Sequence, residues 1–198
     1  EGEDGPPSLD TVQSTFYTLG GSDVISGNEG PDIVFGGAVS DTISGGDGND
    51  ILLGDHGEYD PSQPAEQRFL SIATSANHGG GSDAIHGDDG DDIILGQQAG
   101  DWLYGDAGQD DMTGGHNVAA GSDAGDTMYG ASGPDPDETV ADGADVMIGD
   151  NGVISRTLTA SGWLSNTFNG AVSRSLLLFD VESLNESAPD GVSGPDEM

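Results

Sequence analysis

Aspartates at intervals of nine residues carry the chemistry that this sequence offers. They form two blocks with the same spacing, one with Asp23, Asp32, Asp41 and Asp50 and one with Asp83, Asp92, Asp101 and Asp110. Carboxylates are hard oxygen ligands, which suit a cation such as calcium. Carboxylates packed side by side without counter-charge repel one another. A row of them at a fixed spacing therefore predicts a repeated cation site.

The residues around each aspartate predict a short turn followed by a short strand. Each aspartate is the last residue of a glycine-rich hexad, and glycine allows the positive φ angles of tight turns that expose backbone carbonyls. An apolar residue follows two positions after each aspartate, at Ile25, Val34, Ile43, Leu52, Ile85, Ile94, Leu103 and Met112. In a strand this residue faces the opposite way from its neighbours. Two nine-residue units then complete one coil, with the apolar residues meeting inside.

Two further units follow the second block out of register. They are Asp126 with Met128 and Asp145 with Met147, displaced by inserts at about residues 116–124 and 134–142. We expect these two aspartates to continue the row.

The repeat resembles the RTX, or haemolysin-type calcium-binding, family, whose consensus is GGxGxDxUx. The most complete unit, residues 45–53, reads GGDGNDILL, and residues 27–35 read GNEGPDIVF. The resemblance covers residues 18–57 and 79–152 and implies an all-β fold, a right-handed parallel β-roll that binds calcium along two edges. Val39 and Ala99 replace the second glycine of the motif, and Thr18 and His78 replace the first. We expect weaker sites at those turns.

Calcium between coils would use aspartates that are 18 positions apart in sequence. The predicted pairs are Asp23 with Asp41, Asp32 with Asp50, Asp83 with Asp101, and Asp92 with Asp110. Backbone carbonyls near Gly27, Glu29, Gly36, Gly45, Asp47, Gly87, Asp89, Gly105 and Ala107 are expected to complete the shells. We expect at least four calcium ions, because calcium tolerates the irregular mixture of carboxylates and carbonyls that magnesium does not. Zinc is disfavoured, since the four histidines show no close pairing and cysteine is absent.

Composition narrows the function classes further. The chain has 35 glycines, and 37 acidic residues face three arginines, which gives a formal net charge of -34. That charge disfavours nucleic acid and anionic membranes as partners. The motifs HExxH, GxSxG and GxxxxGK[ST] are absent, so we expect no enzyme. No signal-peptide pattern or long apolar run is present, which indicates a mature or excised piece without membrane insertion.

The repeat pattern divides the chain into segments. Residues 1–17 lead into a first roll block at 18–57, and 58–78 form an insert that we expect as a flap or small hairpin on one edge. A second block spans 79–152. Residues 153–182 alternate around Asn169 and Gly170 and predict a β-hairpin that caps the roll or joins another copy. Residues 183–198 read as an acidic linker or tail.

A calcium-dependent structural module is the leading functional hypothesis. One apolar side chain per nine residues contributes roughly 1.5 to 3 kcal/mol, whereas ordering costs about 1 to 2 kcal/mol for each residue's backbone. Metal binding must therefore supply folding energy. The resemblance implies a bacterial protein secreted by type I secretion that folds outside the cell or on its surface.

Two alternatives belong to other classes. An adhesive or carbohydrate-binding module for extracellular polysaccharide needs exposed aromatic residues along one face. The candidates are Trp102, Tyr104, Tyr129 and Trp163. A self-assembling filament or surface-layer subunit would associate through the roll ends and the hairpin of residues 153–182.

Overall fold

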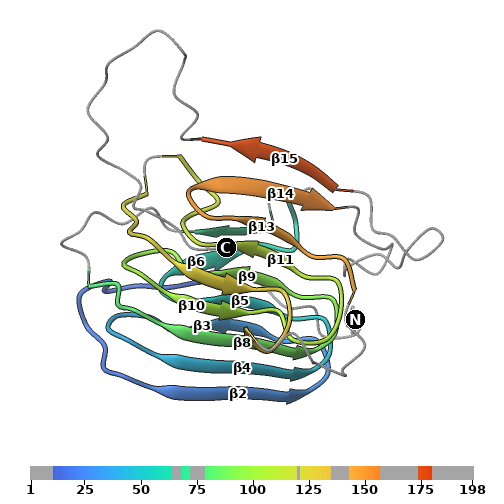
Figure 1. Cartoon of the computed structure of the whole chain (residues 1–198). Coiled ribbons are helices and arrows are strands. Elements are labelled where there is room, and N and C mark those ends of the chain that lie inside the picture. The colour runs from blue at the N-terminus through green and yellow to red at the C-terminus, as the bar shows by residue number, and fades with distance from the viewer. Residues whose placement is uncertain are drawn as a thin grey trace, which may run out of the picture.

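The computed structural model describes residues 11–63, 68–71, 79–119, 121–134, 143–156 and 174–179. Within these residues every regular element is a β-strand, and no helix is long and apolar enough to cross a membrane. The strands, seen in Figure 1, are β1 (Val12–Gln13), β2 (Val24–Glu29), β3 (Ile33–Phe35), β4 (Thr42–Asp47), β5 (Ile51–Leu53), β6 (Gly57–Tyr59), β7 (Phe69–Ser71), β8 (Ala84–Asp89), β9 (Ile93–Leu95), β10 (Trp102–Tyr104), β11 (Asp111–Thr113), β12 (Thr127–Tyr129), β13 (Val146–Ile148), β14 (Gly152–Arg156) and β15 (Arg174–Leu178).

The repeats form a parallel β-roll of two sheets, which confirms the predicted fold class. The first sheet has five strands in the order β12-β10-β8-β4-β2, and the second has five in the order β13-β11-β9-β5-β3. Neighbouring strands in both sheets run parallel, as successive coils stack in Figure 1. The register is kept across the insert, because Ile43 of β4 pairs directly with Ile85 of β8.

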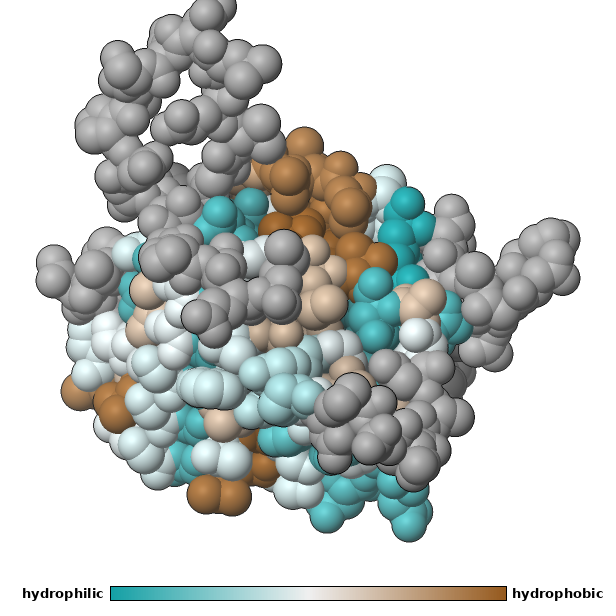
Figure 2. All heavy atoms as spheres, in the orientation of Figure 1, coloured by the Kyte–Doolittle hydropathy of each residue, from teal (hydrophilic) through white to brown (hydrophobic). Residues whose placement is uncertain are grey.

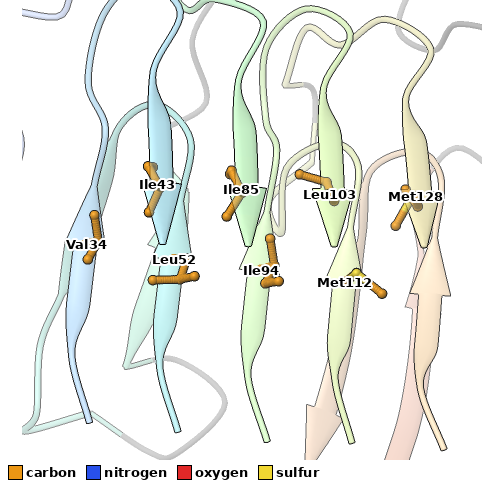
Figure 3. Close-up of a cluster of buried hydrophobic side chains, with 8 residues drawn as sticks. All are labelled: Val34, Ile43, Leu52, Ile85, Ile94, Leu103, Met112 and Met128. Atoms are coloured by element: carbon orange, nitrogen blue, oxygen red, sulfur yellow. The ribbon is translucent and has the colours of Figure 1, made fainter. Parts of the chain in front are cut away.

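The inner core consists of the apolar residues at the centre of each strand. Figure 3 shows the buried members of this core, each from a different strand, pointing between the two sheets. The buried members are Val34, Ile43, Leu52, Ile85, Ile94, Leu103, Met112 and Met128, with Ile25 and Met147 packed against them. The apolar slot of the nine-residue unit is therefore the inside of the roll, because alternate residues of a strand face opposite sides.

A second apolar cluster covers the outside of the second sheet. Strands β3, β5 and β9 are apolar at all three positions, so their flanking side chains would otherwise face water. Ile51, Leu53, Ile93 and Leu95 pack instead with Tyr59 of β6 and Phe69 of β7. These two strands and β1 form an antiparallel sheet in the order β1-β6-β7. The described residues of the insert thus pair as a small hairpin, and this hairpin covers an outer face of the roll because burying apolar surface is favourable.

The C-terminal strands β14 and β15 form an antiparallel pair beyond the last coil, as predicted (Figure 1). The pair also packs against the second sheet, where Arg156 and Arg174 both donate hydrogen bonds to the buried carboxylate of Asp111 in β11. The side chains of Arg156 and Asp111 are each 1% exposed. The expected turn at Asn169 and Gly170 lies outside the described residues.

Candidate metal centre

The turns of the roll lie along two edges. We call edge A the set of turns that lead from the first sheet to the second, at residues 27–32, 45–50, 87–92, 105–110, 130–134 and 143–145. Edge B leads back, at residues 36–41, 54–56, 79–83, 96–101, 114–119 and 121–126. The second position of a hexad has positive φ even without glycine, with 76° at Asn28, 68° at Asp88 and 81° at Gln97. This conformation lets each hexad turn sharply between its two strands.

The repeat aspartates stack into one ladder on each edge. One carboxylate oxygen, Oδ1, accepts a hydrogen bond from the backbone N–H of the aspartate one coil earlier, for example 2.8 Å from Asp32 N to Asp50 Oδ1. The ladder on edge A contains Asp32, Asp50, Asp92, Asp110 and Asp145. The ladder on edge B contains Asp23, Asp41, Asp83, Asp101 and Asp126. All four predicted pairs are thus adjacent, and the two displaced units continue the ladders.

The second carboxylate oxygen, Oδ2, faces the first glycine of its own turn. Around the position that a Cβ would take at Gly45, Asp50 Oδ2 lies at 2.4 Å and the carbonyl oxygen of Gly87 at 2.7 Å. At Gly87 the corresponding oxygens belong to Asp92 and Gly105, both at 2.5 Å. A carboxylate and a carbonyl from adjacent coils therefore converge where only glycine leaves room.

These converging oxygens fit a calcium ion. Six of the Oδ2 atoms are buried with no hydrogen-bond partner, namely those of Asp32, Asp41, Asp50, Asp83, Asp92 and Asp101. A buried carboxylate oxygen is costly unless a hydrogen-bond donor or a cation satisfies it. Bound calcium would supply positive charge to hard oxygens that no protein donor reaches.

Burial makes these carboxylates hard to ionise without a counter-ion. It raises the pKa of Asp83 to about 8, that of Asp92 to about 9 and that of Asp101 to about 11. Nearby aspartates raise the pKa further, both those of the same ladder and Asp55 beside Asp83 and Asp101, against the lowering effect of the backbone hydrogen bonds that these carboxylates accept. Charged forms of both ladders therefore require an added cation.

Six of the nine predicted carbonyl ligands divide into two groups. The carbonyls of Gly45, Gly87 and Gly105 point at the first glycine of the preceding coil and line the cradle. Those of Asp47, Asp89 and Ala107 accept hydrogen bonds of 2.6 to 2.8 Å from glycine N–H groups of neighbouring coils. Gly27 and Glu29 belong to the first turn of edge A, and Gly36 to the first complete turn of edge B.

A separate group of possible ligands lies on the outer side of edge A. One ligand atom each from His86, Asp88 and Asp106 lie within 4.8 Å of one another. His86 Nδ1 is 2.8 Å from Asp106 Oδ2, and its ring stacks on Tyr104 with centroids 4.3 Å apart. Hydrogen bonds within the group, including one from Ser44 to Asp88, already account for its geometry.

Stacked parallel coils with a buried aspartate and a glycine carbonyl at each turn define a calcium-binding β-roll. In agreement, residues 17–52 and 79–112 match the family model for the RTX calcium-binding nonapeptide repeat, in four copies. These two stretches of the chain belong to that family, which confirms the resemblance seen in the repeat. No curated protein and no solved structure matches the chain.

Several residues that shape the edges were not predicted from the sequence. Asp55, Gln97 and Gln98 are buried in edge B, and Arg156 reaches the roll from β14. One signal was present, since residues 96–101 read GQQAGD and place two glutamines where the consensus has glycine and a variable residue. A second signal was the location of two of the three arginines in the last quarter of the chain.

The cradle can be tested by adding one methyl group. Gly45→Ala places a Cβ at 2.4 Å from Asp50 Oδ2 and 2.7 Å from the Gly87 carbonyl, so the coils must separate. Overpacking of this kind costs about 1 to 3 kcal/mol. We expect the calcium concentration at the folding midpoint to rise about tenfold or more. Gly21→Ala is the control, because no atom lies within 4 Å of its Cβ position. Equal midpoints for both variants would refute the cradle.

Proposed function

We propose that the chain is a calcium-dependent structural module of a secreted or cell-surface bacterial RTX protein. Its repeat aspartates and turn carbonyls hold calcium between coils, and the roll folds when it meets calcium outside the cell. The buried Oδ2 atoms that face glycine carbonyls of the next coil carry this proposal. A scaffolding role suits them, since both ladders lie inside the roll edges and not in a cleft for substrate.

The net charge of -34 also supports folding that depends on calcium. In a calcium-poor compartment the ladder carboxylates repel one another and oppose a compact state. Each ion bound between two coils adds its binding free energy to folding. Segments 18–57 and 79–152 act as one roll in this proposal, with 58–78 and 153–182 as its covers and 183–198 as a linker.

A calcium titration tests the function directly. The chain, freed of metal by chelator, should give a largely unfolded far-UV circular dichroism spectrum and gain β signal cooperatively as calcium is added. Asp50→Asn keeps the Oδ1 acceptor but loses the charged Oδ2, so it should need more calcium. Glu58→Gln, on the β6 hairpin, is the control for the charge change. A β-rich spectrum that excess chelator leaves unchanged would exclude calcium-dependent folding.

Self-association is a second candidate function, which an exposed apolar row favours. Leu176, Leu177 and Leu178 of β15 are 57%, 58% and 49% exposed. Figure 2 shows hydrophobic surface in the region of β14 and β15. An exposed apolar strand is a site where another chain pairs. Light scattering during the calcium titration separates an assembling subunit from a monomeric spacer.

The described aromatic residues do not favour a carbohydrate platform. Tyr104 stacks on His86 and on Tyr129, with ring centroids 4.3 and 5.5 Å apart, so the rings cover one another's faces. Trp102, in β10 beside these rings, is 49% exposed. A single exposed ring does not make a row of aromatic residues along this face. Trp163 lies outside the described residues.

A further inference from the structure

Strand β15 presents three consecutive leucines to solvent. Leu176, Leu177 and Leu178 are each about half exposed. Because consecutive side chains of a strand point to opposite faces, both faces of β15 are open to solvent. Among the described residues its one partner strand is β14, and Figure 1 shows β15 as the outer strand of that pair. Within this part of the chain, β15 is therefore an apolar edge strand.

The register with β14 shows which backbone groups lie at the free edge of β15. The N–H of Phe179 donates a hydrogen bond of 3.1 Å to the carbonyl of Asn151, on the β14 side. Leu177 lies two positions earlier and pairs with β14 in the same register. Hydrogen-bonded pairs alternate along an antiparallel ladder, so Leu177 also turns its N–H and carbonyl toward β14. The backbone groups of Leu176 and Leu178 therefore point toward the free edge.

The charge of the chain restricts where a second copy can approach. The formal net charge is -34, so two copies repel one another over acidic surface. Residues 151–179 contain no aspartate or glutamate, and they include Arg156 and Arg174, two of the three arginines. Both β14 and β15 lie within this stretch. A second copy therefore meets less repulsion at β15 than at the acidic turns of the roll.

We propose that two copies of the chain pair through β15 in antiparallel orientation, with Leu177 on the two-fold axis. This register sets Leu176 opposite Leu178 of the partner subunit, so every leucine packs beside a leucine. The edge-facing groups of Leu176 and Leu178 make the hydrogen bonds, and Leu177 forms the close, non-hydrogen-bonded pair. A symmetric pairing of this kind closes after two copies, unlike a filament. The inference deepens the self-association candidate and rests on the proposed function for its dependence on calcium.

Calcium should control this pairing through the folded roll. Arg174 at the start of β15 donates to the carboxylate of Asp111 and, at 2.9 Å, to the carbonyl of Ala144. Asp111 directly follows the ladder residue Asp110, so its position depends on the stacked coils. Under the proposed function these coils unfold in chelator, and the ordered edge is lost with them. The dimer should form in calcium and not in chelator.

Sedimentation velocity of the full chain in saturating calcium tests the pairing. Wild type should reach twice the mass of one chain at micromolar concentrations, since three leucines make a small interface. Leu177→Asp sets two carboxylates together on the axis and should weaken the dimer about tenfold or more. Leu19→Asp, at an exposed leucine outside β14 and β15, is the matched control and should dimerise like wild type.

The outcomes separate this inference from the proposed function. A chain that circular dichroism shows to fold with calcium, but that stays a monomer, would overturn the pairing and leave calcium-dependent folding intact. Particles that keep growing with concentration would overturn the closed dimer. A monomer that floats with phosphatidylcholine vesicles would assign the leucines to a lipid surface and also overturn it. Failure of the wild-type chain to fold with calcium would reject the proposed function itself.

Cysteine cross-linking tests the register even if Leu177→Asp does not fold. The chain has no cysteine of its own. Non-hydrogen-bonded partners in an antiparallel pair have Cα atoms about 4.5 Å apart, within the disulfide range of about 4.4 to 6.8 Å. Leu177→Cys should therefore form a covalent dimer on oxidation in calcium. Ser175→Cys, on the same face of the same strand, and Leu19→Cys should not. Equal cross-linking of the Leu177 and Ser175 variants would overturn the register.

Discussion

Acid should partly replace calcium: in chelator, the chain is expected to gain β structure when the pH is lowered from about 8 to about 5. The pKa of Asp83 is raised to about 8, that of Asp92 to about 9 and that of Asp101 to about 11, against the ordinary aspartate value of 3.8. The folded state therefore binds more protons than the unfolded state over this range. Stability is then fully present below the unfolded pKa and lost as pH rises through the folded values.

The size of this effect should be large for a chain without metal. Each unit of pKa difference corresponds to about 1.4 kcal/mol, and whole domains are stable by only about 5 to 15 kcal/mol. One imidazole acts in the opposite sense, because burial lowers the pKa of His116 to about 4. The stability that neutral His116 contributes is lost as pH falls from the ordinary histidine value of 6.5 toward about 4. Three carboxyl groups outweigh it in this window.

Calcium should reverse the sign of the pH dependence. The ladder carboxylates must lose their protons to serve as ligands, so the calcium midpoint should fall as pH rises. Circular dichroism at about pH 5, 6.5 and 8, with chelator and with graded calcium, measures both trends. A metal-free chain that loses β signal on acidification, or a midpoint that is independent of pH, would contradict the assignment of buried carboxylates as the calcium ligands.

The second large effect is expected at the buried charges that hold the C-terminal strands. Arg156 donates to the Asp111 carboxylate and also to the carbonyls of Asp92 and Gln109, at 2.9 and 3.1 Å. Removing one partner of a buried ion pair costs about 3 to 5 kcal/mol, because the other charge stays behind unpaired. Arg156→Gln should therefore destabilise the calcium-loaded roll by that amount. The Asp92 carbonyl belongs to a ladder residue, so the loss should spread into edge A.

Denaturant unfolding in saturating calcium measures this change in the free energy of unfolding. Arg68→Gln is the matched control, because Arg68 donates its described hydrogen bond to the carbonyl of Gln63 at an exposed position. Asp111→Asn should be as damaging as Arg156→Gln, since it leaves two arginines facing a neutral amide. If Arg156→Gln and Arg68→Gln unfold at the same denaturant concentration, the ion group does not anchor the pair β14 and β15.

The roll itself follows from a local rule that the sequence repeats. Each unit pairs one turn with one inward apolar residue, and the period of two in a strand decides which side faces in. Asp126 and Asp145 were predicted to continue the row despite their inserts, and both enter the ladders. The inserts leave from turns, so the coils on either side keep their register.

The covers of the roll were harder to predict because they depend on contacts distant in sequence. Strands β3, β5 and β9 read IVF, ILL and IIL, apolar on both faces, whereas β4 and β8 read as apolar inside and polar outside. A strand that is apolar on both faces is buried on both. That contrast indicates a covered outer face on the second sheet. It does not identify the cover, which Tyr59 and Phe69 supply from the insert.

The hydrogen bonds of the Gln97 side chain were also beyond the motif. The sequence shows that Val39 and Ala99 depart from glycine, from which we expected weaker sites at those turns. It does not show that Gln97 reaches Asp55 and His56 across the coils, because residues 55 and 97 become neighbours only once the roll has formed. Whether the repeat aspartates are ligands stays a prediction on both edges.

The central claim is that calcium occupies the turns between coils. A crystal structure of the calcium-loaded chain, with anomalous scattering used to locate the ions, tests it most directly. We predict calcium peaks along the turns of both edges, each between a repeat aspartate and the glycine carbonyl of the adjacent coil. A folded roll with no anomalous peaks at these turns would contradict the claim.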